Sequence, residues 1–481
     1  MRRLNFLREF SAEETMLLLV LGGGSFVLMS NLSSINVALP QIQRDFGSSL
    51  SDVKWVAIIG FIISASLSLL FGRVGDIYGR NRIYRTGVIV YTSGSLLCAL
   101  AISLPMLLAM RVVMAVGMAM VIPLSGAILA AAAKPERRGQ LIGMSASFAA
   151  AGQLMGPTIG GFILDVFSWR GIFVFNGTLG VLLCIAQFVL LRGISDERRT
   201  GRLDLIGAAL MLVAFPSLLL GLSFGPRDGW TEGSTLMWFG LSAAGFVAFA
   251  IREARFPAPL ARFDLFKHLP FVVAIAGVMV VAFVQNPITL FVPVYLQTVL
   301  KLGSFDVGLL MVSLPLATLV AGPMGGRLAD RYPPGLVAAG GIALLFVAIL
   351  VYAQLHVDTA PLLVLVPLIL VGASTGITRP ANQVVAYRSV TPAEYGSLAA
   401  MLNSAQMLAG TIGTTITVAI SESLAVKGNA ASFADAQSQT FTLLLPLLAL
   451  GVAISLFGGR RREREDAAAV KETAVTEKAP A

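Results

Sequence analysis

The stretch Gly72-Arg73-Val74-Gly75-Asp76-Ile77-Tyr78-Gly79-Arg80-Asn81-Arg82 is charged, rich in glycine, and lies between two long apolar runs. A similar stretch, Gly326-Arg327-Leu328-Ala329-Asp330-Arg331-Tyr332, begins 254 residues later. Each stretch ends the second apolar run of its half of the chain. We therefore predict two charged loops on the same side of a duplicated membrane protein.

The bulk composition agrees with a membrane protein. Of 481 residues, 56% are hydrophobic and 13% are charged, and the mean hydropathy is +0.82. Soluble domains carry about 25% charged residues. Cys98 and Cys184 both lie in apolar runs, so no disulfide framework, metal site or cofactor is expected. The first apolar run is followed by many others, and we expect a retained helix there rather than a cleaved signal peptide.

Helix length gives the predicted number of membrane spans. A helix needs about 20 apolar residues to cross a hydrocarbon core about 30 Å thick. This measure predicts fourteen spans, near residues 16–38, 53–72, 83–103, 105–132, 140–164, 169–191, 203–224, 234–251, 270–299, 306–326, 336–354, 361–386, 396–420 and 440–458. The expected parts are a six-helix half (1–192), two linking helices (193–267), a second six-helix half (268–459) and a disordered cytoplasmic tail (460–481).

Lysine and arginine are distributed unevenly along this topology. With the N-terminus inside, 27 of them fall in the predicted inner segments and 6 in the outer loops. This asymmetry is what the positive-inside rule describes. We therefore predict a multi-pass protein of the cell (inner) membrane with both termini in the cytoplasm. The net charge of +9 then reflects topology, and no nucleic acid partner is needed.

Other positions repeat at nearly the same offset. Asn31 and Asn286 are 255 residues apart, and Pro123 and Pro380 are 257 apart. Two homologous halves around a central site are the architecture of many secondary transporters.

On these residues the chain resembles the major facilitator superfamily, specifically its fourteen-span drug:proton antiporter branch of multidrug efflux type. The first stretch matches the superfamily signature at Gly72, Asp76, Gly79 and Arg80, and Gly152-Gln153-Leu154-Met155-Gly156-Pro157-Thr158-Ile159-Gly160-Gly161 matches the antiporter signature. The resemblance implies an all-α polytopic fold with two six-helix halves and an extra helix pair. We expect a monomer with a small-molecule substrate.

The resemblance also implies a gating role for the two charged stretches. In similar transporters, such contacts tie the halves together on the cytoplasmic side and break when that side opens. The alternative is that the charges only fix topology, but Asp contributes little to orientation, and the acid is repeated. The predicted gating residues are Gly72, Asp76, Gly79, Arg80, Arg327 and Asp330.

A glycine face is predicted in the fifth span. Gly152, Gly156 and Gly160 recur every four residues and share one side of a helix. Such a face lets another helix approach closely. In similar exporters this seam lies where the halves meet, so the resemblance implies an interdomain seam that includes Pro157 and Gly161. Static packing is the alternative.

The interior charges depart from the antiporter pattern. Asn31 stands where this branch usually carries a first-span acid, and none of the 26 Asp and Glu residues lies in the middle of a predicted span. Arg111 and Arg379 do lie within spans, and intramembrane charge marks a functional-site hypothesis. Arg111 is expected to serve proton coupling or helix pairing. Arg379 either lines a cavity or extends to the cytoplasmic boundary.

An arginine-bearing, acid-poor interior favours a neutral, zwitterionic or anionic substrate over a lipophilic dication. Each polar candidate has an alternative role in bonding a neighbouring helix. The Gln285-Asn286 pair precedes Pro287, where a broken helix would mark a cavity. The candidate substrate-binding residues are Asn31, Asn36, Gln153, Gln285, Asn286, Arg379, Asn382, Asn403 and Gln406.

These features predict a secondary active transporter that exports small, drug-like amphiphilic compounds by alternating access, coupled to an ion gradient such as that of protons. One alternative is an exporter or facilitator for an endogenous anionic or lipid-like metabolite, without proton coupling through the first helix. Another is a non-transporting membrane sensor. An enzyme is not expected, because no HExxH or GxxxxGK[ST] motif is present.

Overall fold

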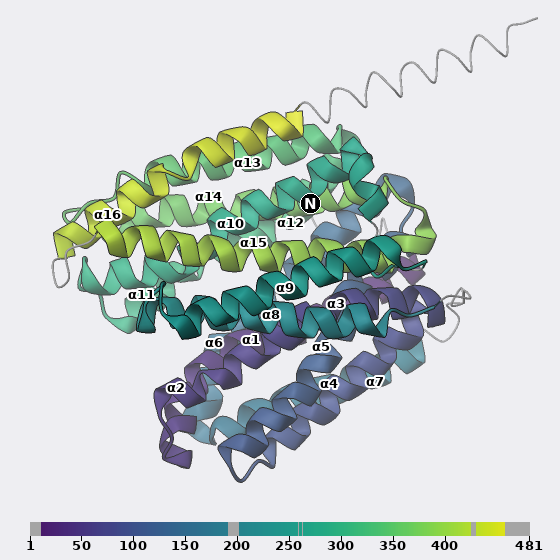
Figure 1. Cartoon of the computed structure of the whole chain (residues 1–481), viewed down its shortest axis with the longest axis horizontal. Helices are drawn as coiled ribbons and strands as arrows, with labels where there is room; N and C mark the ends of the chain where they lie inside the picture. The colour runs from purple at the N-terminus through teal and green to yellow at the C-terminus, as the bar shows by residue number, and fades with distance from the viewer. Residues whose placement is uncertain (1–10, 191–201, 258, 262, 425–429, 457–481) are drawn as a thin grey trace, which may run out of the picture. The chain divides into compact units, whose positions relative to one another are not determined.

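The computed structural model describes residues 11–190, 202–257, 259–261, 263–424 and 430–456 (Figure 1). Within these residues, every regular element is a helix. The predicted cytoplasmic tail at 460–481 lies outside the described residues. The all-α polytopic prediction is therefore confirmed for the described part of the chain.

The chain divides into two compact units, and each contains a short piece from the other half of the sequence. Unit 1 comprises Met1–Lys134, Met144–Phe263 and Val390–Thr411, and unit 2 comprises Pro135–Gly143, Asp264–Ser389 and Ile412–Ala481. The predicted linking helices belong to unit 1. There they form a hairpin, α8 against α9, and α8 also packs against α3.

The elements that begin in the first 255 residues mostly build unit 1. They are α1 (Ala12–Phe46), α2 (Leu50–Val53), α3 (Trp55–Tyr78), α4 (Arg80–Ala99), α5 (Leu104–Ala132), η2 (Pro135–Arg137), α6 (Arg138–Val166), α7 (Trp169–Leu190), α8 (Leu205–Asp228) and α9 (Gly233–Arg255). Only η2 and the first residues of α6 belong to unit 2.

The later elements mostly build unit 2. They are η3 (Phe263–Lys267), α10 (Leu269–Thr298), α11 (Ser304–Met311), α12 (Ser313–Arg331), α13 (Pro334–Tyr352), η4 (Pro361–Val364), α14 (Leu365–Tyr387), η5 (Pro392–Glu394), α15 (Tyr395–Leu424) and α16 (Ala430–Thr442). Here η5 and the first part of α15 belong to unit 1.

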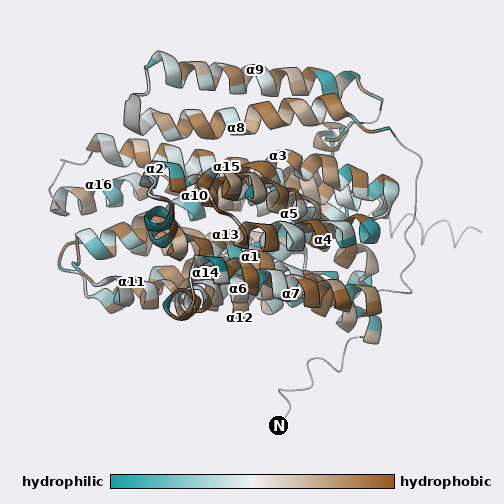
Figure 2. Cartoon of the chain, turned by 90° about the horizontal axis from the view of Figure 1, so that it is seen from below, coloured by the Kyte–Doolittle hydropathy of each residue, from teal (hydrophilic) through white to brown (hydrophobic). Residues whose placement is uncertain are grey.

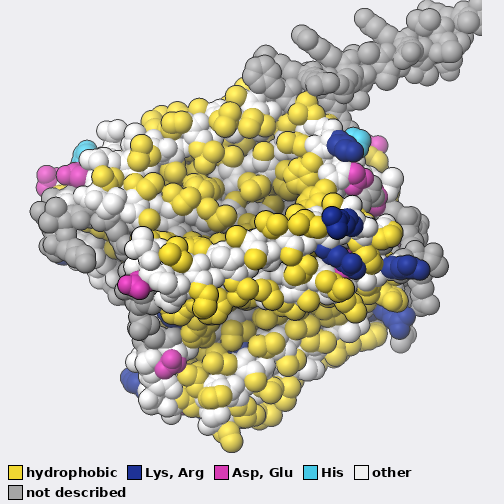
Figure 3. Space-filling view, viewed as in Figure 1, with side chains coloured by type: hydrophobic (Ala, Val, Ile, Leu, Met, Phe, Trp, Pro, Cys, Tyr) yellow, Lys and Arg dark blue, Asp and Glu magenta, His cyan; other side chains and the backbone are white. Residues whose placement is uncertain are grey.

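In the described residues, eleven helices are long and apolar enough to cross a membrane. Three more, α4, α6 and α15, have 20, 29 and 30 residues but contain too many polar residues to meet the same criterion. The sides of the helices are mostly hydrophobic, and charged side chains lie at helix ends (Figures 2 and 3). The protein is thus a multi-pass membrane protein, and the count of fourteen spans remains a prediction.

The prediction that residues 72–82 form a loop is wrong. Residues 72–78 are the last turns of α3, residues 80–82 begin α4, and only Gly79 interrupts the helical backbone. Its φ of 103° lies in a region that a residue with a Cβ rarely adopts. The second stretch likewise lies in the end of α12, up to Arg331. Helices keep their backbone hydrogen bonds in lipid and in water, so charge alone does not end them.

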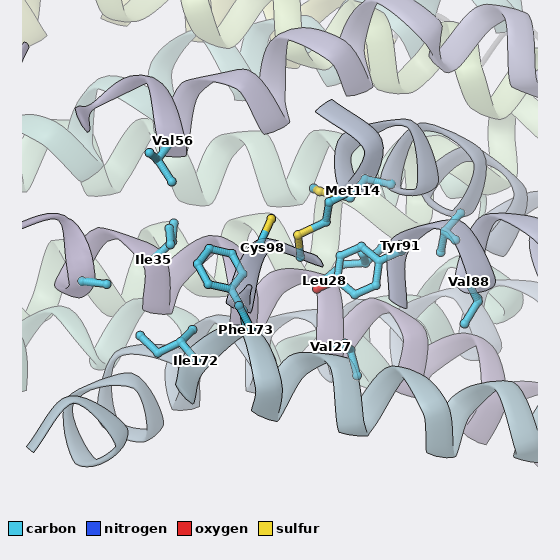
Figure 4. Packing of buried hydrophobic residues seen from close by; sticks show 14 of the residues in the cluster. Val27, Leu28, Ile35, Val56, Val88, Tyr91, Cys98, Met114, Ile172 and Phe173 are labelled. Carbon is cyan, nitrogen blue, oxygen red and sulfur yellow. The ribbon is translucent and has the colours of Figure 1, made fainter. Parts of the chain in front are cut away.

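Unit 1 has a continuous apolar core that includes Ile35, Tyr91, Cys98 and Phe173, drawn from α1, α4 and α7 (Figure 4). Polar contacts fix one end of this core. The side chain of Asp45, near the end of α1, accepts hydrogen bonds from Trp169 Nε1 and from Arg170, both at 2.8 Å. Since Trp169 is fully buried, these contacts set the start of α7 against the end of α1.

Candidate gating and transport site

Asp76 lies in the last turn of α3 and contacts the first turn of α15. Its Oδ1 accepts the backbone N–H of Gly396 at 2.9 Å, and its Oδ2 accepts the backbone N–H and the hydroxyl of Ser397, each at 2.8 Å. The residue is only 4% exposed. A carboxylate at the end of its own helix opposes that helix's dipole, whereas at the start of another helix it is stabilised. We refer to this arrangement as the Asp76 contact.

Arg80 completes the Asp76 contact from the start of α4. Its guanidinium forms an ion pair with Asp76 Oδ1 at 2.8 Å and donates to the backbone oxygen of Pro392. The guanidinium also lies 5.6 Å from the ring centre of Tyr395. Arg80 therefore neutralises the buried carboxylate and holds the segment that precedes α15.

Glycines allow the two helices of the Asp76 contact to approach. A Cβ on Gly396 would lie 2.5 Å from Asp76 Oδ1, and one on Gly72 would lie 2.6 Å from the Gly396 backbone oxygen. Real side chains do not reach such distances. The backbone of α15 must therefore stay bare here for the carboxylate to reach its N–H groups.

The same arrangement occurs in unit 2 between α12 and the start of α6. Asp330 Oδ1 accepts the N–H of Gly139 at 2.7 Å, and Oδ2 accepts the N–H of Gln140 at 2.8 Å. A Cβ on Gly139 would lie 2.6 Å from the backbone oxygen of Gly326. Arg388 and Arg138 are close enough to interact electrostatically with the carboxylate. We call this the Asp330 contact.

The residues whose N–H groups donate to the two aspartates did not stand out in the sequence, although a signal exists. Gly139 and Gly396 are each the second residue of a helix, and each follows a proline by four positions. The segments 135–139 and 392–396 share the pattern Pro-x-x-x-Gly at an offset of 257, and each begins with a short 3₁₀ turn. This offset is close to the one that relates the two charged stretches.

Arg111 and Asn31, which the sequence placed in separate roles, lie together in unit 1. Arg111 Nη1 donates to Asn31 Oδ1 at 3.0 Å, and Arg111 Nε donates to the backbone oxygen of Val56 at 2.8 Å. Arg111 is 1% exposed and Asn31 is fully buried. Arg111 thus joins α5 to α1 and α3, a helix-pairing geometry in which no acid takes part among the residues that the structure describes.

The remaining substrate candidates differ in burial. Asn382 is buried against Gly277, and the Asn403 amide donates to Ser68 Oγ at 3.2 Å. Gln285, Arg379 and Gln406 are half-buried, whereas Asn36, Gln153 and Asn286 are exposed. Their role in substrate binding remains a prediction.

The prediction of a broken helix at Pro287 is wrong. The helix α10 continues through Pro287 to Thr298. A proline frees the carbonyl four residues earlier, here that of Phe283. Gly413 of α15 packs directly on this Phe283 backbone in unit 2. Close approach by another helix thus covers the freed carbonyl, so Pro287 gives no evidence of a cavity.

The glycines of the predicted seam pack against another helix of unit 1. Cβ atoms on Gly152, Gly156 and Gly160 would collide with α1 at Phe26, Ser30 and Ser34 respectively. A Cβ on Gly161 would meet no atom within 4 Å, and Pro157 is exposed. The described contacts are therefore those of helix packing within one unit, and the interdomain role remains a prediction.

Two compact helical units in a multi-pass membrane protein agree with the repeat architecture of many secondary transporters. Residues 21–414 match the family described as Major Facilitator Superfamily, and the chain belongs to this superfamily. It is therefore a secondary transporter of small molecules, and the prediction that it is not an enzyme is confirmed.

Two relatives and one solved structure extend this comparison. The chain is 24% identical over 459 residues to the riboflavin transporter RibZ of Clostridioides difficile (strain 630), covering 94% of this chain and 99% of that protein. It is 30% identical over 406 residues to the multidrug resistance protein Stp of Mycobacterium tuberculosis (strain CDC 1551 / Oshkosh), covering 84% of this chain and 74% of that protein. The human organic anion transporter MFSD10 (TETRAN) shares the fold, with a TM-score of 0.62 at 16% identity over 92% of this chain and 97% of that one.

Proposed function

We propose that the protein is a fourteen-span exporter that moves small neutral, zwitterionic or anionic amphiphiles out of the cell by alternating access. The observation that carries this proposal is the pair of carboxylate contacts, formed by Asp76 and Asp330 at equivalent places of the repeat. In the proposed topology both lie on the cytoplasmic side.

The energetics of the two contacts suit a gate. A carboxylate at a helix N-terminus is stabilised by up to about 2 kcal/mol in a partly buried geometry. The differential binding of a substrate can offset an energy of this size. The Asp76 and Asp330 contacts would hold the cytoplasmic side closed while the site faces outward, and would break when that side opens.

Export and a drug-like substrate are supported by the relative named as a multidrug resistance protein. The choice of charge class rests on this chain itself. Arg111 is buried with an amide rather than a carboxylate as its side-chain partner, so the interior of unit 1 favours electron-rich groups over cations. Proton coupling through the first helix is not proposed, since an amide does not carry protons at physiological pH.

The proposal is tested by transport into proteoliposomes that contain the full chain. Matched cationic, neutral and anionic amphiphiles are supplied with and without a proton gradient, and the wild type is compared with Asn31→Asp. We expect the wild type to move neutral or anionic compounds, and Asn31→Asp to increase the dependence on the proton gradient. Robust transport of cationic dyes that persists in Arg379→Ala would contradict the charge class.

A second candidate function is the transport of an endogenous metabolite. The similarity to the riboflavin transporter supports it, because that similarity covers nearly the full length of both chains. Riboflavin is therefore added to the same screen as a neutral heterocycle. Saturable movement of riboflavin, with none of the drug-like compounds, would replace the first candidate. A protein that binds these compounds but moves none of them would be a membrane sensor.

A further inference from the structure

Arg111 carries a buried positive charge that the described protein groups do not neutralise. The titratable groups that interact with it are Tyr91 and Cys98, and both are ordinarily neutral at pH 7. A charge in a low-dielectric interior is costly unless it is paired with an opposite charge. The hydrogen bonds that the guanidinium donates to Asn31 and Val56 satisfy part of it but leave its charge uncompensated.

Three hydrogen-bond donors around this charge have no partner in the described residues. They are Arg111 Nη2, Asn31 Nδ2 and Tyr91 Oη, and the three residues are 1%, 0% and 2% exposed. Buried polar atoms in native proteins nearly always have a partner. Since an amide nitrogen and a guanidinium can only donate, an acceptor is what Arg111 Nη2 and Asn31 Nδ2 lack, and the Tyr91 hydroxyl can donate or accept.

Gly60 of α3 brings a backbone without a side chain next to the guanidinium. An atom at the position of its absent Cβ would lie 3.4 Å from Arg111 Nη2, 3.8 Å from Leu32 Cδ2 and 3.9 Å from Met118 Sδ. These are ordinary contact distances, so no side chain of α3 lies between its backbone at Gly60 and the Nη2 atom of Arg111. Apolar groups, among them Phe173 with its ring centre 5.9 Å from the guanidinium, surround the rest.

We propose that Arg111, Asn31 and Tyr91 bind a small monovalent anion beside Gly60. The anion is either a free halide or an anionic group carried by a transported compound. It supplies the counter-charge that Asn31 does not, and it accepts hydrogen bonds from the three free donors. This proposal goes beyond the exporter proposal and does not depend on the direction of transport.

The test measures the thermal unfolding midpoint of the detergent-purified full chain at constant ionic strength. Sodium gluconate is replaced stepwise by sodium chloride, and in a second series by sodium benzoate. A ligand that binds only the folded state raises the midpoint in a saturable way. We expect a rise on the order of 5 °C when the anion reaches about 100 times its dissociation constant.

Two variants and a control give the test its specificity. Asn31→Asp places a carboxylate next to Arg111, so its midpoint is expected to be independent of chloride and benzoate. Arg111→Gln removes the charge and is expected to lose the response, although it also removes contacts that hold α5. Ser103→Asp adds a carboxylate at the start of α5, where Ser103 already caps the helix, and is expected to keep the full response.

The outcomes separate the sources of the anion. A rise with chloride identifies a free halide, whereas a rise with benzoate alone identifies an anionic group on a larger compound. The proposal is overturned if neither salt raises the wild-type midpoint above that in gluconate. It is also overturned if Asn31→Asp responds as strongly as the wild type.

Discussion

The Asp76 and Asp330 contacts share one geometry but differ in what surrounds the carboxylate. Each aspartate follows a glycine by four residues at the end of a helix, and each accepts the N–H groups of the second and third residues of another helix. Asp76 is 4% exposed and also binds the hydroxyl of Ser397 and the guanidinium of Arg80. Asp330 is half-buried, and Gln140 stands where the first contact has a serine.

The sequence explains part of this difference. The residues that follow Asp76 by three and four positions are Gly79 and Arg80, whereas Pro333 and Pro334 follow Asp330 at the same positions. Arg80 therefore has no counterpart at this position, and the charges near Asp330 come from Arg138 and Arg388 instead. The two contacts thus share their backbone arrangement and differ in the side chains around the carboxylate. We expect the Asp76 contact to be the harder one to open.

The largest effect is expected for Asp76→Ala. The substitution leaves Arg80 unpaired and two N–H groups of α15 without an acceptor, at a cost of about 3–5 kcal/mol. Hydrogen exchange at the Gly396 and Ser397 amides should accelerate by at least about 100-fold, and transport should fall with it. Asp52→Ala removes an exposed acid from the same unit and should change neither. Unchanged amide protection in Asp76→Ala would show that the contact does not hold α15.

A smaller effect is expected when a side chain is introduced where the two helix backbones approach each other. Gly396→Ala and Gly139→Ala should each destabilise their contact by about 1–3 kcal/mol, because the new Cβ would collide with backbone and carboxylate atoms. The measurement is amide exchange in each unit, with Gly240→Ala and Gly340→Ala as controls at positions where a Cβ meets nothing within 4 Å. If both glycine variants behave like their controls, close approach is not a requirement of the shared geometry.

Asp330→Ala should have a smaller effect than Asp76→Ala. It removes two hydrogen bonds from a half-buried carboxylate, which corresponds to about 2 kcal/mol. Exchange at the Gly139 and Gln140 amides should accelerate by about 30-fold. Equal or greater acceleration than that caused by Asp76→Ala would reverse the proposed order of the two contacts.

The smallest effect is expected when the Ser397 hydroxyl is removed, since only the Asp76 contact includes a hydroxyl. Ser397→Ala should weaken the Asp76 contact by about 1 kcal/mol, which is close to a 5-fold change in exchange. Ser423→Ala removes an exposed hydroxyl from the same helix and should be neutral. Gln140→Ser should strengthen the Asp330 contact by up to a similar amount. A loss of protection in Gln140→Ser would mean that the two contacts are not equivalent in detail.

Part of the candidate site could be predicted from the sequence. The pair Asp76 and Asp330 was found because both acids recur in strongly basic stretches. Their partners were missed because the donors are backbone N–H groups. The Pro-x-x-x-Gly pattern contains no side chain that would indicate binding of a carboxylate. The loop at 72–82 was predicted wrongly, since charge indicates where a helix leaves the membrane and does not indicate where its hydrogen bonds stop.

By itself, the sequence determined the membrane class and the absence of an acid at Asn31, and it predicted the duplication. These follow from hydropathy, spacing and residue identity, which need no knowledge of neighbours. Only the tertiary structure decided that Asp76 and Asp330 cap the starts of other helices, that the glycines from Gly152 to Gly160 pack on α1, and that Asn31 meets Arg111. Each of these depends on which helix faces join, and such pairings bring together residues that are tens to hundreds of positions apart.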